Sequence, residues 1–210
     1  MTNSPNLPDV SPTSLADLVD RDRVMDPGIR PLWSPMPRVT GSVYAVRCAP
    51  GDNLMMHAAI YRAEPGSVIV VDSGGTPLAV AGGNVCAVAQ RRGIAGFVVD
   101  GNIRDLQEVR EMGFPVFARG VFPKPGTKEH VVASGEAVVG GVEVRAGDVV
   151  VADEEGIVVA GADRAAELLA AAAEREAADA AQSLDEWEAA HRRKIEAGLA
   201  AGGDAAGLPD

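Results

Sequence analysis

A regular alternation of strand-like and helix-like segments between Ser67 and Gly120 constrains the fold of this chain more than any other feature. The strand-like segments are continuous apolar runs, which are typical of strands buried on both faces of a parallel sheet. A helix-like segment follows each of the first two runs, as crossovers between parallel strands require. The pattern therefore predicts a βαβαβ unit. Its strands cover residues 67–72, 94–100 and 115–120, and its helices lie within residues 77–93 and 104–113.

The first third of the chain predicts two helices and one strand. Residues 14–24 form a short amphipathic segment, with Ser14 as its expected cap. Residues 41–49 alternate between apolar and polar side chains and predict a strand. A helix-like segment follows, and either Asp52 or Asn53 is placed to cap it.

The chain after Gly120 changes in character. Short β-rich runs separated by Gly, Asp and Glu predict hairpins. An Ala- and Glu-rich helix begins near Asp163, and the capping-box sequence Ser183–Glu186 is placed to restart it. We therefore expect a disordered N-terminal tail (1–13), one α/β domain (14–162), a C-terminal helical extension (163–198) and a flexible tail (199–210).

Composition excludes several classes of partner. The formal net charge is -11 and no basic cluster offsets it, so we expect no nucleic-acid ligand. The N-terminal residues have no signal-peptide pattern, and no apolar stretch is long enough to predict a membrane span. Cys48 and Cys86 lack metal-ligand spacing and lie in apolar contexts, which indicates buried thiols in a reducing compartment. The sequence thus predicts a cytoplasmic protein.

Three polar or Gly-rich loops follow the predicted strands or precede the predicted helices, over residues 72–75, 81–84 and 100–105. The carboxyl ends of parallel strands meet at one edge of a sheet, where ligands of α/β proteins collect. Glycine lets the backbone approach a ligand, and free N–H groups at a helix start attract anions. Glycines of this kind also serve as plain turns, so the loops alone leave both readings open.

Arg104 and Asp105 stand side by side where the third of these loops meets a helix. Arginine offers a planar fork for a carboxylate, and aspartate offers a hard oxygen ligand for Mg²⁺. Together they suit a small 2-oxo acid. In the alternative interpretation, Asp105 only caps the helix and Arg104 pairs with an exposed acid such as Glu108.

Three stretches resemble the RraA-like family: residues 82–120, "PGDNLMMH" and "GDVVVADEEGIVV". This family includes class II pyruvate aldolases that cleave 4-hydroxy-4-methyl-2-oxoglutarate or 4-carboxy-4-hydroxy-2-oxoadipate, and a regulator of ribonuclease activity. The resemblance implies an α/β fold of the three-layer β/β/α swivelling-domain type, with a C-terminal helix. It also implies a homotrimer or a dimer of trimers, and an aldolase that uses Mg²⁺ or Mn²⁺ instead of a Schiff-base lysine.

The resemblance assigns roles to the Arg-Asp pair. Arg104 would bind the pyruvyl group and stabilise its enolate, and Asp105 would hold the metal ion. In aldolases of the family, an Asp or Glu is separated from this pair by twenty residues. The chain has Gly83 at that position, and Asn84 replaces an apolar residue. Gly83 cannot orient water, so we expect that Gly83→Asp would favour retro-aldol cleavage.

Other residues are assigned to substrate binding. Backbone N–H groups within residues 82–85 (Gly82, Gly83, Asn84 and Val85) are expected to contact the pyruvate carboxylate. Asn53 and His57 match a "GDN…H" segment of the aldolase branch, although a lone helical histidine is commonly structural.

The predicted function is a divalent-metal-dependent lyase acting on a small 2-oxo acid through a pyruvate enolate. It would perform retro-aldol cleavage of a 4-hydroxy-2-oxo acid, oxaloacetate decarboxylation, or both. Two alternatives remain open because of Gly83. In the first, the protein is a non-catalytic ring-shaped regulator of the ribonuclease-regulator type. In the second, it uses the enolate site for different chemistry.

Overall fold

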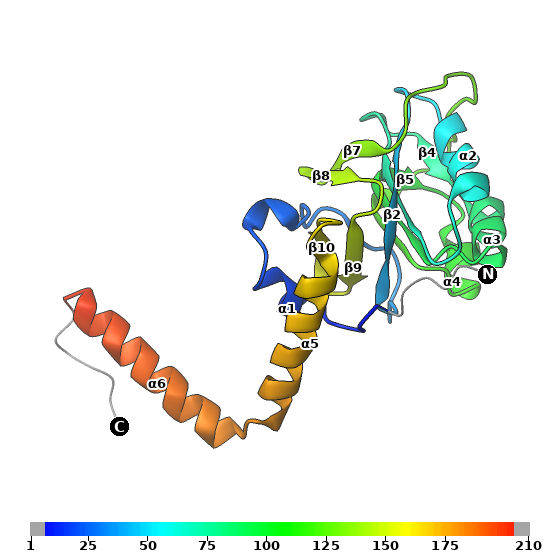
Figure 1. Cartoon of the computed structure of the whole chain (residues 1–210). Coiled ribbons are helices and arrows are strands. Elements are labelled where there is room, and N and C mark those ends of the chain that lie inside the picture. The colour runs from blue at the N-terminus through cyan, green and yellow to red at the C-terminus, as the bar shows by residue number, and fades with distance from the viewer. Residues whose placement is uncertain (1–6, 204–210) are drawn as a thin grey trace. The chain divides into compact units, whose positions relative to one another are not determined.

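The computed structural model of this chain describes residues 7–203, which form two compact units (Figure 1). The first unit extends to Ala173, and the second begins at Glu174. The first unit therefore ends later than the predicted domain boundary at residue 162.

An eight-stranded mixed sheet forms the centre of the first unit. Strands β2, β3, β5 and β6 are parallel neighbours, and β4 pairs in parallel with the end of β5. The order β3-β4-α3-β5-α4-β6 along the chain confirms the predicted βαβαβ unit, with the short strand β4 added before α3. In spatial order the strands are β1 (Arg30–Pro31), β6 (Val116–Val121), β5 (Gly96–Ile103), β3 (Val68–Asp72), β2 (Val39–Arg47), β9 (Val149–Asp153) and β10 (Gly156–Ala160), with β4 (Ala79–Ala81) beside β5.

The two faces of the sheet are covered by different layers. Helices α2 (Leu54–Arg62), α3 (Gly83–Arg91) and α4 (Leu106–Glu111) lie together on one side (Figure 1). The hairpin of β7 (Glu136–Val139) and β8 (Val142–Arg145) contributes to the apolar core of the other side. This arrangement confirms the β/β/α layers that the family resemblance implied.

The position of strand β3 between two apolar cores explains why its sequence is a continuous apolar run. Ile69 and Val71 belong to the core beneath the helices, whereas Val68 and Val70 belong to the core on the hairpin side. All four side chains are buried. Successive side chains of a strand point to opposite faces, so a strand between two cores must be apolar at every position.

A third apolar cluster joins the two ends of the first unit. Val10 and Leu15, next to or within helix α1 (Pro12–Ala16), are in one cluster with Leu169 of helix α5 (Ala165–Ala181) and with strands β9 and β10. The described part of the predicted disordered tail, residues 7–13, is thus ordered against this core. Burial of Val10, which the Pro- and Ser-rich composition did not indicate, is the physical reason. Residues 1–6 lie outside the described residues.

The first helix begins earlier than predicted. Ser11 Oγ, and not Ser14, caps α1 by accepting the N–H of Ser14 at 3.1 Å, and Pro12 occupies the first turn. Proline suits this position because its fixed φ fits the helix and it has no N–H to leave unpaired. The helix ends at Ala16, and a short 3-10 helix, η1 (Arg21–Arg23), follows in place of the predicted continuation.

The second unit contains the end of α5 and helix α6 (Leu184–Ala201). The predicted capping box is confirmed: Ser183 Oγ accepts the N–H of Glu186 at 3.3 Å, and Glu186 Oε2 accepts the N–H of Ser183 at 2.9 Å. Helix α6 continues to Ala201, so it includes the start of the predicted tail (199–210), of which residues 204–210 lie outside the described residues.

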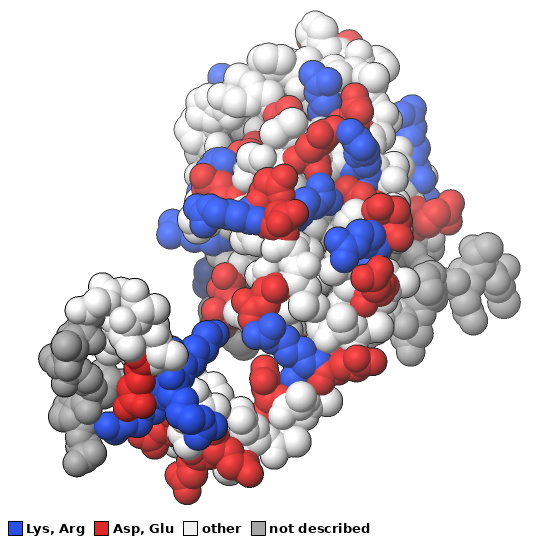
Figure 2. Space-filling view, turned by 60° about the vertical axis from the view of Figure 1, so that its left-hand side comes forward, with Lys and Arg blue, Asp and Glu red and all other residues white. Residues whose placement is uncertain are grey.

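Two surface properties bear on the predicted partners. None of the helices within residues 7–203 is long and apolar enough to cross a membrane. Figure 2 shows acidic and basic side chains interleaved over one face of the molecule.

Candidate functional site

Strand β5 carries the Arg-Asp pair directly to the edge of the sheet. The sequence predicted a loop over residues 100–105, but β5 continues to Ile103. The loop prediction is therefore wrong for its first four residues. The physical reason is that β4 and β6 flank this part of β5 and pair with it, Ala81 opposite Ile103 on one side and Ile103 opposite Val121 on the other.

The Arg-Asp pair lies against the start of helix α3. The Arg104 N–H donates to Ala81 O at 3.0 Å, which places the pair beside Gly82. The Gly83 N–H donates to Asp105 Oδ2 at 3.1 Å, and Arg104 Nε lies 3.4 Å from the same oxygen. The Asp105 carboxylate thus contacts both a cation and the positive end of α3.

The backbone of Asp105 is unusual. Its φ is 58°, and among the described residues it is the one non-glycine residue with a positive φ. This left-handed conformation costs on the order of 1 kcal/mol, although aspartate tolerates it better than most residues. Such conformations cluster at functional sites, where the surrounding structure holds them.

The alternative interpretation, in which Asp105 only caps the helix, is correct for the position of Asp105 but not for its side chain. Asp105 is the N-cap residue of α4, but its side chain makes no cap hydrogen bond there and turns to Gly83 of α3 instead. Arg104 pairs with Asp105, and within residues 7–203 it makes no ion pair with Glu108.

A small pocket of about 90 Å³ opens beside this pair. Its walls include seven of the eight residues that the sequence assigned to the site, and the eighth, Gly83, contacts Asp105 from behind them. The predicted loop over residues 72–75 does not line this pocket: Asp72 Oδ1 accepts the N–H of Gly74 within the loop. The lining residues are Asn53, His57, Ala79, Ala81, Gly82, Asn84, Val85, Arg104, Asp105, Pro125 and Lys128.

Gly82 allows the pocket wall to approach the pair closely. A Cβ at Gly82 would lie 2.5 Å from Asp105 Oδ2 and 2.9 Å from Arg104 Cγ, both well inside normal contact distance. The backbone of Gly82 is extended, so the requirement for glycine here comes from space and not from conformation.

Asn53, in the wall of the pocket, carries a buried and unpaired side-chain oxygen. Its side chain is 2% exposed, and its Nδ2 donates long hydrogen bonds to Ala79 O at 3.4 Å and Gly126 O at 3.5 Å. Asn53 Oδ1 is one of two buried side-chain atoms in the described structure that have no hydrogen-bond partner. An unpaired buried acceptor costs about 1–3 kcal/mol, so this oxygen suits a donor from a bound molecule.

Sequence reasoning missed the segment that closes the pocket, residues 124–130. The buried Asp52 carboxylate binds this segment: Oδ2 accepts Thr127 Oγ1 at 2.9 Å, the Glu129 N–H at 2.6 Å and the His130 N–H at 3.3 Å. Asn53 is the N-cap residue of α2 but makes no side-chain cap hydrogen bond, whereas Asp52 Oδ1 accepts the Leu54 N–H at 2.8 Å. Binding the start of α2 is thus only part of the function of Asp52. The sequence did contain a signal for this segment, because it follows the carboxyl end of a predicted parallel strand.

The electrostatics of the pocket favour an anionic ligand. Arg104 and Lys128 contribute positive charge, and Asp105 contributes one negative charge. Burial lowers the pKa of His57, and the positive charges of Lys128 and Arg104 lower it further. His57 is therefore neutral at neutral pH, and its imidazole acts as a hydrogen-bonding group there and not as a cation.

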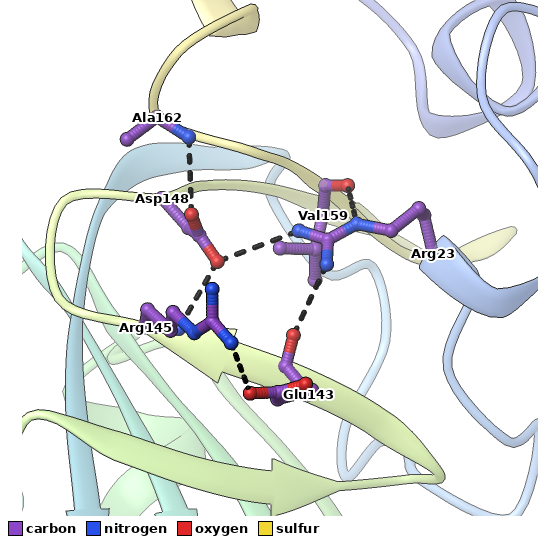
Figure 3. Close-up of polar contacts among 6 residues, drawn as sticks. All are labelled: Arg23, Glu143, Arg145, Asp148, Val159 and Ala162. Atoms are coloured by element: carbon purple, nitrogen blue, oxygen red, sulfur yellow. Dashed lines mark hydrogen bonds and ion pairs between the residues drawn. The ribbon is translucent and has the colours of Figure 1, made fainter.

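A larger cavity of about 420 Å³ lies elsewhere, beside η1 and β8. Figure 3 shows that its central polar groups are satisfied by one another. The Asp148 carboxylate, on a residue 6% exposed, accepts the N–H groups of Arg145 and Ala162 at 3.0 Å each and pairs with Arg23 at 3.4 Å. Arg23 also donates to Glu143 O. These contacts join strands and helices, so we assign this cluster a structural role.

Comparison with known families agrees with the fold described above. The family model described as RraA-like: Aldolase/RraA matches residues 6–159. The chain belongs to the RraA-like family. The resemblance inferred from the sequence is thereby confirmed.

Relatives in this family carry two kinds of name. A Thermus thermophilus protein named 4-hydroxy-4-methyl-2-oxoglutarate aldolase is 33% identical over 152 residues, which cover 70% of this chain and 90% of the relative. A Halalkalibacterium halodurans protein that provisionally carries the same name is 36% identical over 172 residues, 81% of each chain. Streptomyces coelicolor RraAS2, described as an unusual member of the RNase ES inhibitor RraA family, has a TM-score of 0.70 at 29% identity and covers 81% of this chain and 89% of its own. The RNA-processing inhibitor RraA from Thermus thermophilus has a TM-score of 0.66 at 30% identity and covers 72% and 93%.

Proposed function

We propose that this RraA-like protein is a divalent-metal-dependent lyase that acts on a small 2-oxo acid through a pyruvate enolate. The observation that carries the proposal is that Arg104, Asp105 and Asn53, whose buried Oδ1 has no hydrogen-bond partner in the described structure, line the same small pocket. A cation, a carboxylate and a buried acceptor are then available to one small ligand. The aldolase names of its relatives support the same class of reaction.

The residues of the pocket fit Mg²⁺ or Mn²⁺. Mg²⁺ in proteins is held by one or two carboxylates and otherwise by water and substrate oxygens. Asp105 supplies a partly exposed carboxylate, and its Oδ1 has no hydrogen bond to any other residue in the described range. No group of three or more His, Cys, Asp or Glu side chains within residues 7–203 is arranged to hold a metal ion, so a closed zinc-type site does not fit. When bound, the ion would supply Lewis-acid stabilisation of negative charge on the substrate oxygens.

Each side chain of the pocket then has a distinct task. The Arg104 guanidinium would bind the oxo-acid oxygens and stabilise the enolate charge as it develops. The Gly83 N–H is already bonded to Asp105, so within the segment 82–85 the N–H groups that remain for the substrate carboxylate are those of Gly82, Asn84 and Val85. Asn53 Oδ1 would accept a hydrogen bond from a substrate hydroxyl, which gives a 4-hydroxy-2-oxo acid a specific partner.

Two reactions share the same enolate. In retro-aldol cleavage the C4 hydroxyl gives its proton to water, a carbonyl forms at C4 as the C3–C4 bond breaks, and the electron pair of that bond forms the pyruvate enolate. In oxaloacetate decarboxylation the bond to the departing CO₂ breaks and the same enolate forms. Decarboxylation has no hydroxyl proton to remove. We therefore propose that this protein retains decarboxylase activity more readily than aldolase activity.

The second candidate is a non-catalytic regulatory ring. It is favoured by the similarity to the RNA-processing inhibitor and by the absence of a side chain at Gly83. This candidate requires no cation and no small-molecule ligand in the pocket, so binding measurements separate the two.

Calorimetric titration with Mn²⁺, with and without oxalate as an enolate mimic, tests the proposal. We compare the parent with Asp105→Asn, because asparagine also tolerates a left-handed backbone, and with Asp163→Asn as an exposed control. We expect the parent and the control to bind Mn²⁺ and to bind oxalate more tightly with Mn²⁺ present. Asp105→Asn should weaken both by about 10-fold or more. A parent that binds neither Mn²⁺ nor oxalate would exclude the lyase proposal.

A further inference from the structure

The side-chain position that Gly83 leaves empty is already filled by another residue. A Cβ at Gly83 would overlap Glu108 Oε2 and would lie 2.9 Å from Glu108 Cδ. The Glu108 carboxylate therefore lies against the Gly83 backbone, in the space where any other residue at position 83 would begin its side chain.

Glu108 reaches this place from the same helix turn as Asp105. Asp105 is the N-cap of α4 and Glu108 is three residues later, so the two side chains project from the same side of the helix. Asp105 Oδ2 accepts the N–H of Gly83 at 3.1 Å, while Glu108 Oε2 approaches the Cα of the same residue. Two carboxylates thus meet at one residue, at the N-terminal end of α3.

The Glu108 carboxylate is available to bind a ligand. Within residues 7–203 its oxygens make no hydrogen bond or ion pair. The Asp105 and Glu108 carboxylates both lie at Gly83, at the start of α3. A cation beside Gly83 would have both carboxylates as potential ligands. Asp105 also lines the adjoining pocket, whose wall includes the buried side chain of Asn53 with its unpaired Oδ1.

We propose that Glu108 is the second carboxylate of the cation site and holds the hydrated ion together with Asp105. This inference rests on the proposed function. Gly83 is then not a missing group but the opening through which Glu108 reaches the site. Mg²⁺ and Mn²⁺ suit such a pair, because they are bound through one or two carboxylates and keep several waters.

The expectation drawn from the sequence for Gly83→Asp changes accordingly. When Glu108 is unchanged, the aspartate side chain introduced at position 83 would displace it. The substitution then exchanges one carboxylate for another instead of adding one. The benefit of Gly83→Asp should appear only when Glu108 has been neutralised.

Electron paramagnetic resonance, which distinguishes free from bound Mn²⁺, measures the affinity of each variant for Mn²⁺ independently of catalytic activity. The variants are Glu108→Gln, Gly83→Ala, their combination, and Gly83→Asp with Glu108→Gln. The matched control is Glu111→Gln, which removes an acid one turn later on α4, where Glu111 Oε1 accepts Gln107 Nε2 at 2.9 Å. Circular dichroism checks that each variant is folded.

We expect Glu108→Gln to weaken Mn²⁺ binding by about 10- to 100-fold, while Glu111→Gln leaves it unchanged. Gly83→Ala should cause a similar loss in the parent by displacing Glu108, and little further loss when Glu108→Gln is present, because coupled residues are not additive. Gly83→Asp in the Glu108→Gln background should recover most of the affinity, since it returns a carboxylate to the same space.

The outcomes separate this inference from the proposed function. If Asp105→Asn loses Mn²⁺ binding while Glu108→Gln binds as the parent does, Glu108 is only a surface acid near α3, and the lyase proposal stands without it. If Gly83→Asp fails to rescue folded Glu108→Gln, the inference that both positions serve one site is wrong. A parent that binds no Mn²⁺ overturns both proposals.

Discussion

Replacing Asp52 by asparagine is expected to destabilise the first unit and to loosen the segment that closes the pocket. The Asp52 carboxylate is 2% exposed and accepts hydrogen bonds from two parts of the chain, the start of α2 at Leu54 and the segment from Thr127 to His130. Asparagine has nearly the same shape but presents an NH₂ group toward one of these sets of donors. The substitution therefore tests charge and hydrogen bonding without creating a cavity.

The size of the effect follows from the pKa of this group. Burial opposes ionisation of Asp52, but the N–H groups of Glu129 and Leu54 and the Thr127 hydroxyl outweigh burial and lower its pKa from 3.8 to about 2. A difference of this size corresponds to about 2 kcal/mol of folding free energy. An asparagine NH₂ group that faces these N–H and O–H donors leaves them without an acceptor, which has a comparable cost of about 1–3 kcal/mol. We therefore expect Asp52→Asn to lower the free energy of unfolding by about 2 kcal/mol at pH 7.

The pH dependence has a definite sign. A carboxylate whose pKa is lower in the folded state stabilises the fold fully above its ordinary pKa, here 3.8, and loses this contribution as the pH falls toward about 2. The difference between parent and variant should therefore shrink as the pH is lowered through this window. Urea unfolding followed by circular dichroism, at fixed protein concentration and at several pH values, measures it, with Asp163→Asn as the exposed control.

A second measurement connects stability to the site. Lys128 lines the pocket and lies in the segment that Asp52 holds, so folded Asp52→Asn should also bind oxalate more weakly than the parent. An Asp52→Asn protein with parental stability at pH 7, or a stability difference that does not change as the pH falls, would refute the reasoning.

Two further outcomes are expected. Gly82→Ala should keep the fold, because its backbone is extended, but the added methyl group would press on Asp105 and Arg104 and weaken Mn²⁺ and oxalate binding by about 10-fold or more in calorimetry; parental affinities would show that the pair moves freely. Light scattering should give about three times the chain mass of 21.6 kDa, or a multiple of that, as a homotrimer or dimer of trimers requires; a monomer at micromolar concentration would contradict this.

The sequence by itself determined the central βαβαβ unit, and the reason is visible in β3. Each strand of the unit lies between two cores, so it must be apolar at nearly every position, and a continuous apolar run of strand length records that requirement in local sequence. The capping box at Ser183 was equally local, because both of its hydrogen bonds join residues three positions apart. The Arg104-Asp105 pair was found for the same reason, as a polar break between two regular elements.

Only the tertiary structure decided how the site is completed. The extension of β5 to Ile103 depends on pairing with β4 and β6, and neither partner is adjacent to it in sequence. Asp52 reads as a helix cap, yet most of its hydrogen bonds reach residues 75 or more positions away. The role proposed for Glu108 depends on the space left by Gly83 on a different helix. Local patterns specify which elements form, but which side chain fills a gap between two elements is set by their packing, because hydrogen bonds and steric contacts act between neighbours in space.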